Sequence, residues 1–258
     1  MQFSFMTFST PELALAEVLA TAQRFGYDSV ELRLDSGHTH GIEVTLSGDD
    51  RKRVREAVAR SGKAISCLAT SCVFADPAKR EAMTADALLR ITLAGDIGAP
   101  TMRVFGGVFP DTISREEAIA GVVSSLRRLA DAAAKHNVIV CMETHDAWCD
   151  PAHVAEVLTR VDHPNIAANW DILHPIRMGL ATIGSSFEAL KPWIRHMHIH
   201  DWKNDALAPI GTGIVDHEKA LALVRGIGYT GAASGEWINW EPYETHLPRE
   251  IATLKTYR

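Results

Sequence analysis

The stretch VIVCMETHDAWCDPAHVAEVLTRVDHPNIAANWD, residues 138–171, contains two short apolar runs separated by one amphipathic segment. The runs VIVCMETH (138–145) and IAANWD (166–171) have the length and the apolar content of buried strands. Residues 151–161 between them carry apolar side chains at helical spacing. A strand, a helix and a second strand in this order predict a parallel βαβ unit.

The same alternation continues in both directions along the chain. Further strands are expected at 2–8, 29–34, 64–70, 101–107, 196–200 and 232–237. Further helices are expected at 11–25, 49–62, 77–97, 114–136, 183–191, 216–227 and 242–256, the first beginning at Pro11 after Thr10. Eight strand–helix units in 258 residues predict a (β/α)₈ TIM barrel. A doubly wound open sheet is the alternative, but no GxGxxG follows the first strand.

Composition restricts the classes of partner. No linker or low-complexity tract interrupts the chain, so residues 1–258 are expected to form one barrel domain. The net charge of −6 disfavours general binding to nucleic acid or to anionic membranes. The N-terminus lacks a basic segment followed by an apolar run, and no stretch approaches the ~18 apolar residues of a membrane span. The four cysteines form no CxxC pair, which favours reduced thiols and a cytoplasmic location.

Four consecutive predicted strands end in a side chain that can bind a metal. These residues are Glu143, Asp171, His200 and Glu236, and each gap (171−143 = 28, 200−171 = 29, 236−200 = 36) is about one βα unit. Alternation along each strand places all four on the inward face, and the carboxyl ends of barrel strands form the active site. Three carboxylates and one imidazole suit one divalent cation, Mn²⁺ or Mg²⁺ first, with Co²⁺ and Zn²⁺ also possible.

This donor set predicts a reaction. A substrate with neighbouring carbonyl and hydroxyl oxygens could chelate the cation, which would stabilise an enediolate. Glu143 and Glu236 lie three strands apart, so one could remove a proton from one face while the other returns it from the opposite face. The expected activity is therefore isomerisation or epimerisation by proton transfer α to a carbonyl.

Eight short motifs carry a resemblance that covers essentially the whole chain. They are GYDSVELR (26–33), MRVFGG (102–107), METH (142–145), NWDILHP (169–175), HMHIHDWK (196–203), PIGTGIVD (209–216), GIGYTG (226–231) and SGEW (234–237). In this order and spacing the chain resembles the xylose isomerase-like superfamily of TIM barrels. That superfamily includes sugar-phosphate isomerases and epimerases, ketose 3-epimerases, inosose dehydratase, hydroxypyruvate isomerase and endonuclease IV.

The resemblance implies roles for individual residues. It implies Glu143, Asp171, His200 and Glu236 as the metal ligands, the two glutamates as acid/base groups, and a contact from His174 to a substrate oxygen. Two positions depart from the ketose 3-epimerases, which carry a glutamate and an arginine where this chain has Cys149 and Ala206. C3 epimerisation of a free ketose is therefore not favoured.

The candidate substrate-binding residues and the two other histidines of the 196–200 strand each allow a functional and a structural interpretation. His174, Arg103, Lys203 and His38 are the candidate substrate-binding residues; Arg103 could instead pair with Glu31, and His38 could belong to a mobile loop. His196 and His198 are expected to support His200 from inside the barrel rather than bind metal.

The leading hypothesis is a divalent-metal-dependent sugar or sugar-phosphate isomerase or epimerase with a small carbohydrate substrate, and a homo-oligomer is possible. The nearest alternative is a dehydratase of a keto-sugar or inosose. From different classes come an endonuclease IV-like abasic-site nuclease, which the acidic balance disfavours, and a non-catalytic sugar-binding barrel.

Overall fold

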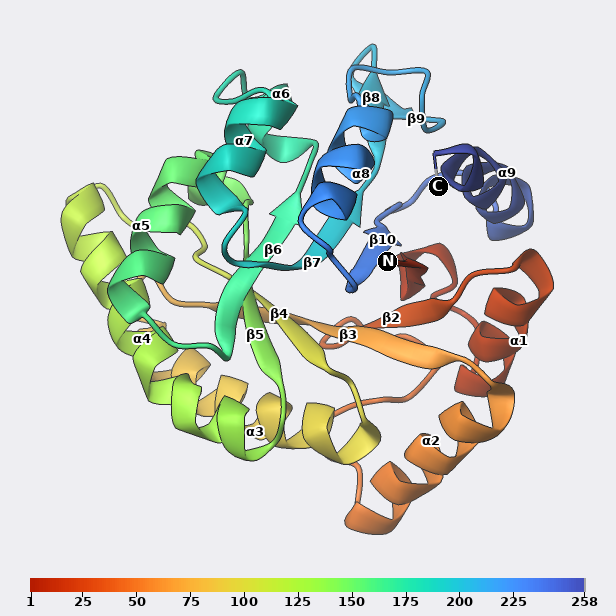
Figure 1. Cartoon of the computed structure of the whole chain (residues 1–258). Helices are drawn as coiled ribbons and strands as arrows, with labels where there is room; N and C mark the ends of the chain where they lie inside the picture. Colours follow the sequence, from red (N-terminus) through yellow and green to blue (C-terminus); the bar gives the residue numbers. More distant parts are fainter. Residues whose placement is uncertain (258) are drawn as a thin grey trace.

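Eight parallel strands close into a barrel in the computed structural model, which describes residues 1–257 (Figure 1). Around the barrel the order is β1, β10, β7, β6, β5, β4, β3, β2, and each neighbouring pair is parallel. The strands are β1 (Gln2–Met6), β2 (Ser29–Arg33), β3 (Ala64–Val73), β4 (Thr101–Phe105), β5 (Ile139–Glu143), β6 (Ile166–Asp171), β7 (Ile194–Ile199) and β10 (Ala232–Gly235). The predicted (β/α)₈ barrel is confirmed.

Helices connect the strands on the outside of the barrel (Figure 1). They are α1 (Leu15–Phe25), α2 (Gly48–Ser61), α3 (Arg80–Ile97), α4 (Arg115–Lys135), α5 (Pro151–Val161), α7 (Ile183–Leu190), α8 (His217–Gly226) and α9 (Tyr243–Thr256). Local sequence explains their starts: Ser114 and Glu117 form a capping box before α4, and Asp150 caps α5 ahead of Pro151 at its first position. None of the described helices is both long enough and apolar enough to cross a membrane.

The first helix begins later than predicted. Thr7–Ser9 form a short 3-10 turn, and α1 starts at Leu15 rather than at Pro11. The carboxylate of Glu17 accepts a hydrogen bond from the Ala14 backbone N–H at 2.8 Å, which fixes the helix start four residues after the predicted one. The expected start at Pro11 is therefore wrong.

Two small elements lie among the loops at the carboxyl ends of the strands. After β7 the chain forms an antiparallel hairpin of β8 (Asp201–Lys203) and β9 (Ala206–Ala208). After β6 it forms the short helix α6 (His174–Arg177). Neither was predicted, and both shape the pocket described below.

The barrel separates an apolar layer from a polar interior. Met142 of β5 and Met197 of β7 point outward into the apolar core between the strands and the helices. Glu143, His196 and His198 on the same strands are buried on the inward side, where they contact one another or Glu31 of β2. The predicted alternation on β5 and β7 is confirmed, and it concentrates ionisable groups along the barrel axis.

Candidate metal centre and active site

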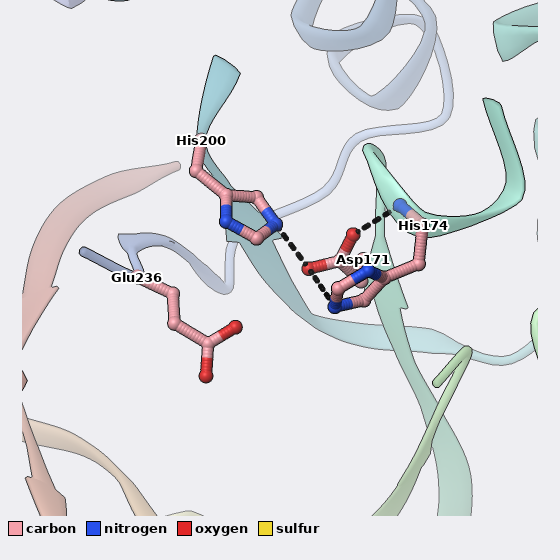
Figure 2. Close-up of side chains that lie close together, drawn as sticks. All are labelled: Asp171, His174, His200 and Glu236. Carbon is pink, nitrogen blue, oxygen red and sulfur yellow. Dashed lines mark hydrogen bonds and ion pairs between the residues drawn. The ribbon is translucent and has the colours of Figure 1, made fainter. Parts of the chain in front are cut away.

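Asp171 is the most firmly held member of the predicted metal set. It ends β6 and is fully buried. Its Oδ1 accepts hydrogen bonds from the backbone N–H groups of Leu173 and His174, both at 2.8 Å. Its Oδ2 accepts one from His200 Nε2 at 2.8 Å, and Figure 2 shows the contacts with His174 and His200. Burial would raise the pKa of Asp171, but His174 and His200 hold that pKa well below its ordinary value. Asp171 is therefore an ionised donor with a fixed orientation.

Glu236 faces Asp171 and the two histidines from the other side of the rim (Figure 2). It follows β10 directly, and its backbone N–H donates to the Ile199 carbonyl at 3.2 Å. Its Oε2 lies 3.4 Å from His198 Nδ1. Burial opposes ionisation, but His198 is the main cause that lowers the pKa of Glu236 to about 2. Glu236 is a carboxylate at neutral pH.

Glu143, at the end of β5, is held from two sides. Its Oε1 accepts from His198 Nδ1 at 3.0 Å, and its Oε2 lies 3.1 Å from Arg103 Nε. The contact with Arg103 is an ion pair without hydrogen-bond alignment, so Glu143 Oε2 is a buried oxygen with no hydrogen-bond partner among the described residues. Buried oxygens of this kind are uncommon, and this one fits a carboxylate that takes a cation.

The donors form two overlapping groups of possible metal ligands within residues 1–257. One group is Asp171, His174, His200 and Glu236, and the other is Glu143, Asp171, His198 and Glu236. Within each group the donor atoms lie within 4.8 Å of one another. The four predicted ligands are thus divided between the groups, which share Asp171 and Glu236, and neither group contains both Glu143 and His200.

A third group lies deeper in the barrel. Glu31 Oε2 accepts from His196 Nε2 at 2.8 Å, and Glu31 Oε1 accepts from His198 Nε2 at 3.1 Å. Burial would raise the pKa of Glu31, but the two histidines hold it well below its ordinary value. His198 therefore lies between the two levels: its Nε2 contacts Glu31 in the deeper group, and its Nδ1 contacts Glu143 and Glu236 nearer the pocket.

The suggested pairing of Glu31 with Arg103 is wrong. Arg103 is 1% exposed and turns toward Glu143, and it donates to the Thr70 carbonyl at 2.6 Å. The register explains the choice, because Arg103 lies beside Cys141 on the neighbouring strand β5, two residues before Glu143. Histidines from β7 reach across the barrel to Glu31 instead.

A pocket of about 380 Å³ opens above the carboxylates. Its lining includes His174, His200 and Glu236, together with residues that were not singled out as contacts in the sequence, namely His145, Arg177 and Asn239. Trp202 and Trp240 also line it, whereas Trp148 and Trp237 are buried beneath the loops. The pocket has the size and the mixed apolar and polar lining of a small-molecule site.

His145 and Arg177 supply cationic groups to this pocket. Burial would lower the pKa of His145, but Asp146 and Glu143 raise it to about 9. Its ring lies 4.6 Å from the ring of His174, and its Nδ1 is 2.8 Å from Asp146 Oδ1. Arg177 lies 3.9 Å above the Trp202 ring. Strand alternation after Glu143 could have identified His145, and the helical turn after His174 could have identified Arg177.

Of the four residues predicted to bind substrate, only one lines the pocket. His174 lines the pocket, and Arg103 lies beneath it beside Glu143. Lys203 is exposed on the β8–β9 hairpin and is not among the lining residues of the pocket. His38 is half-buried, lies 3.2 Å from Thr7 Oγ1 and packs near Phe8, also away from the pocket lining.

A family model described as xylose isomerase-like TIM barrel matches residues 19–257. The chain belongs to this family. The resemblance inferred from the eight motifs is thereby confirmed.

Known members of this xylose isomerase-like fold differ in their reactions. A curated 3-dehydroshikimate dehydratase of Bacillus anthracis is 29% identical over 136 residues, which cover 45% of this chain and 48% of that protein. The match therefore spans about half of the relative's length. A crystal structure described as the probable 3-DHS dehydratase AsbF of the same organism has a TM-score of 0.81 and 22% identity, with 99% of both chains covered. The 3-keto-D-glucoside 4-epimerase YcjR of E. coli has a TM-score of 0.82 and 16% identity, again with 99% of both chains covered.

Proposed function

We propose that this xylose isomerase-like chain is a divalent-metal-dependent enzyme that moves a proton α to a carbonyl of a small polyhydroxylated substrate, as a sugar or sugar-phosphate isomerase or epimerase. One observation carries the proposal: two buried carboxylates, Glu143 and Glu236, approach the same imidazole from strands three positions apart around the barrel. Glu236 lines a small-molecule pocket, and Glu143 is fully buried beside the same imidazole. Two bases on opposite sides of one carbon are what an epimerase needs, and one of them suffices for an isomerase.

The donor set fits a divalent cation. Asp171 and Glu236, which both groups of possible ligands share, would hold it together with Glu143 from one group and His200 from the other. The low pKa values of Asp171 and Glu236 keep both oxygens charged at neutral pH, and Glu143 Oε2 has no competing hydrogen bond among the described residues. When bound, Mn²⁺ or a similar cation withdraws electrons from the substrate carbonyl and acidifies the neighbouring C–H.

Proton transfer and substrate binding are assigned to residues of the chain itself. Glu143 is oriented by His198 and Arg103, so its carboxylate is held ready to accept the α-proton. Glu236 faces the pocket and would accept or return the proton on the other face. His174 lines the pocket and would hydrogen-bond a substrate oxygen, and Trp202 and Trp240 line it as well, where their rings would reduce the access of water to a bound substrate.

Dehydration is a second candidate because of two specific observations. The curated relative is a dehydratase. In addition, His145 lines the pocket two residues after Glu143, where its ring could pass a proton to a departing hydroxyl while a glutamate removes the α-proton. Both reactions share the first proton transfer and differ in the fate of the neighbouring hydroxyl group.

The experiment uses the full chain loaded with Mn²⁺ and a panel of ketoses, sugar phosphates, inososes and 3-dehydroshikimate in D₂O. Deuterium incorporation with an isomer or epimer as product supports the leading proposal, and loss of water supports dehydration. Metal binding without α-proton exchange in any panel member would contradict both. Glu188→Gln, an exposed glutamate of α7, is the matched control for Glu236→Gln.

A further inference from the structure

A second cavity lies at the opposite end of the barrel from the proposed active site. Its volume is about 500 Å³, and its lining includes residues at the amino-terminal ends of the strands, such as Gln2 of β1, Thr101 of β4 and Ala232 of β10. The loop between α8 and β10, residues 227–231, forms another wall. This loop contains most of the GIGYTG motif, which the proposed active site does not use.

The cavity is lined by a positively charged side chain and, among the described residues, by no acidic side chain. Arg195 of β7 lines it and is exposed. Its guanidinium donates to the Ile194 carbonyl at 2.9 Å and makes no ion pair with a carboxylate within residues 1–257. No aspartate or glutamate lines the cavity, whereas Ile139, Ile194 and Ile227 give it apolar walls. The cavity therefore combines one unpaired cation with apolar surface.

A buried polar atom at the cavity lacks a partner. His196 lines the cavity and is fully buried; its Nε2 donates to Glu31, while its Nδ1 has no hydrogen-bond partner among the described residues. In the tautomer that carries its only proton on Nε2, Nδ1 is a hydrogen-bond acceptor. Buried side-chain nitrogens usually have a partner, so this one points to a donor supplied from the cavity.

We propose that this cavity is a second binding site, distinct from the pocket above the metal ligands, for a small hydroxylated organic anion. Arg195 binds the oxyanion, because a guanidinium fits a carboxylate or phosphate through two N–H groups. His196 Nδ1 accepts a hydrogen bond from a hydroxyl of the ligand, and the isoleucines contact its carbon skeleton. The volume suits a small metabolite.

Binding to the full-length protein tests this proposal, with lactate, glycerol 3-phosphate and inorganic phosphate as probes and calorimetry as the measurement. Arg195→Gln removes the cation and keeps the side-chain length, and Ile227→Trp fills the cavity from an exposed position of the loop. Arg53→Gln, an exposed arginine of α2, is the matched control. Arg177→Gln tests for binding in the other pocket.

At least one probe is expected to bind with 1:1 stoichiometry. Its Kd should rise about tenfold or more in Arg195→Gln and in Ile227→Trp, and stay within about twofold in both other variants. Preference for lactate identifies the oxyanion as a carboxylate, and preference for glycerol 3-phosphate identifies it as a phosphate. Inorganic phosphate that binds more tightly than glycerol 3-phosphate would contradict the proposed contacts with a carbon skeleton. Absence of saturable binding in the parent protein, or unchanged affinity in Arg195→Gln, overturns the proposal. The test does not depend on turnover, so its failure is distinguishable from failure of the proposed enzymatic function.

Discussion

Replacing Glu236 with Gln separates the chemistry of this site from its stability. Glutamine keeps the size of the side chain and removes the base, so turnover should fall about 100- to 10,000-fold, the usual contribution of a general base. The cost in stability should be small. Glu236 lies 3.4 Å from His198, the longest of that imidazole's three carboxylate contacts, which also include Glu143 at 3.0 Å and Glu31 at 3.1 Å. His198 keeps two partners, and we expect a loss of about 1–2 kcal/mol in the free energy of unfolding.

The assay must separate loss of the base from loss of the cation, because Glu236 is also a proposed ligand. Turnover and deuterium incorporation are measured across increasing Mn²⁺, and the values at saturating metal are compared. Circular dichroism and urea unfolding report the fold, and Glu188→Gln provides the control. Near-normal turnover of Glu236→Gln at saturating metal would refute a two-glutamate mechanism.

Four further outcomes are expected. Glu31→Gln removes the carboxylate that pairs with His196 and one of the three beside His198, and it should lower the unfolding free energy in urea by about 3–5 kcal/mol; a loss no larger than that of exposed Glu56→Gln would contradict the pairing. Burial and Arg249 lower the pKa of His246 to about 4, so the folded state binds this proton less tightly than the unfolded chain and stability is lost as pH falls from about 6.5 to 4. Between pH 7 and pH 5 the free energy of unfolding of the parent protein should fall by about 2 kcal/mol more than that of His246→Leu. Equal decreases in the two proteins would show that His246 is not the cause of this pH dependence. A Cβ on Gly213 would lie 2.3 Å from Asp201 Oδ1, so Gly213→Ala should lower the unfolding free energy by about 1–3 kcal/mol; an unchanged urea midpoint would argue against this close packing. Mn²⁺ should raise the Tm of the chelator-treated protein, because a free Mn²⁺ concentration of 100 times Kd adds about 2.7 kcal/mol to the free energy of unfolding. An equal rise in Tm for Asp171→Asn would exclude the proposed site.

The periodicity of apolar residues in the sequence was sufficient to predict the barrel and to predict which strand side chains face its interior. Alternation along β5 and β7 places Glu143, His196 and His198 inside, because adjacent residues of a strand face opposite sides of the sheet. The hairpin β8–β9 was missed although a signal was present. Asn204 and Asp205 both adopt positive φ, 51° and 57°, and these residue types are favoured in two-residue hairpin turns of this kind.

Contacts across the barrel could not be read from the sequence. Both Glu31 and Arg103 were correctly expected inside, but the choice of partners depends on which side chains reach across the interior. His198 contacts carboxylates from three strands, β2, β5 and the end of β10, and nothing in its spacing from Glu31 or Glu143 indicates this. The metal-ligand roles of the strand-end residues likewise remain predictions, because proximity shows only that they could share a cation.

The charge balance inside the barrel gives an independent reason to expect a cation there. Four buried carboxylates, Glu31, Glu143, Asp171 and Glu236, contribute four negative charges, and buried Arg103 contributes one fixed positive charge. The difference, four minus one, must be met by imidazolium groups or by a bound cation, because uncompensated buried charge is costly. Burial lowers the pKa of His198, but Glu31, Glu143 and Glu236 raise it well above its ordinary value, so this imidazole carries one of the missing charges. Burial lowers the pKa of His200, but Asp171 raises it above its ordinary value, so this imidazole can carry a second charge. A divalent cation bound at the same end of the barrel would take the place of that proton and supply the rest.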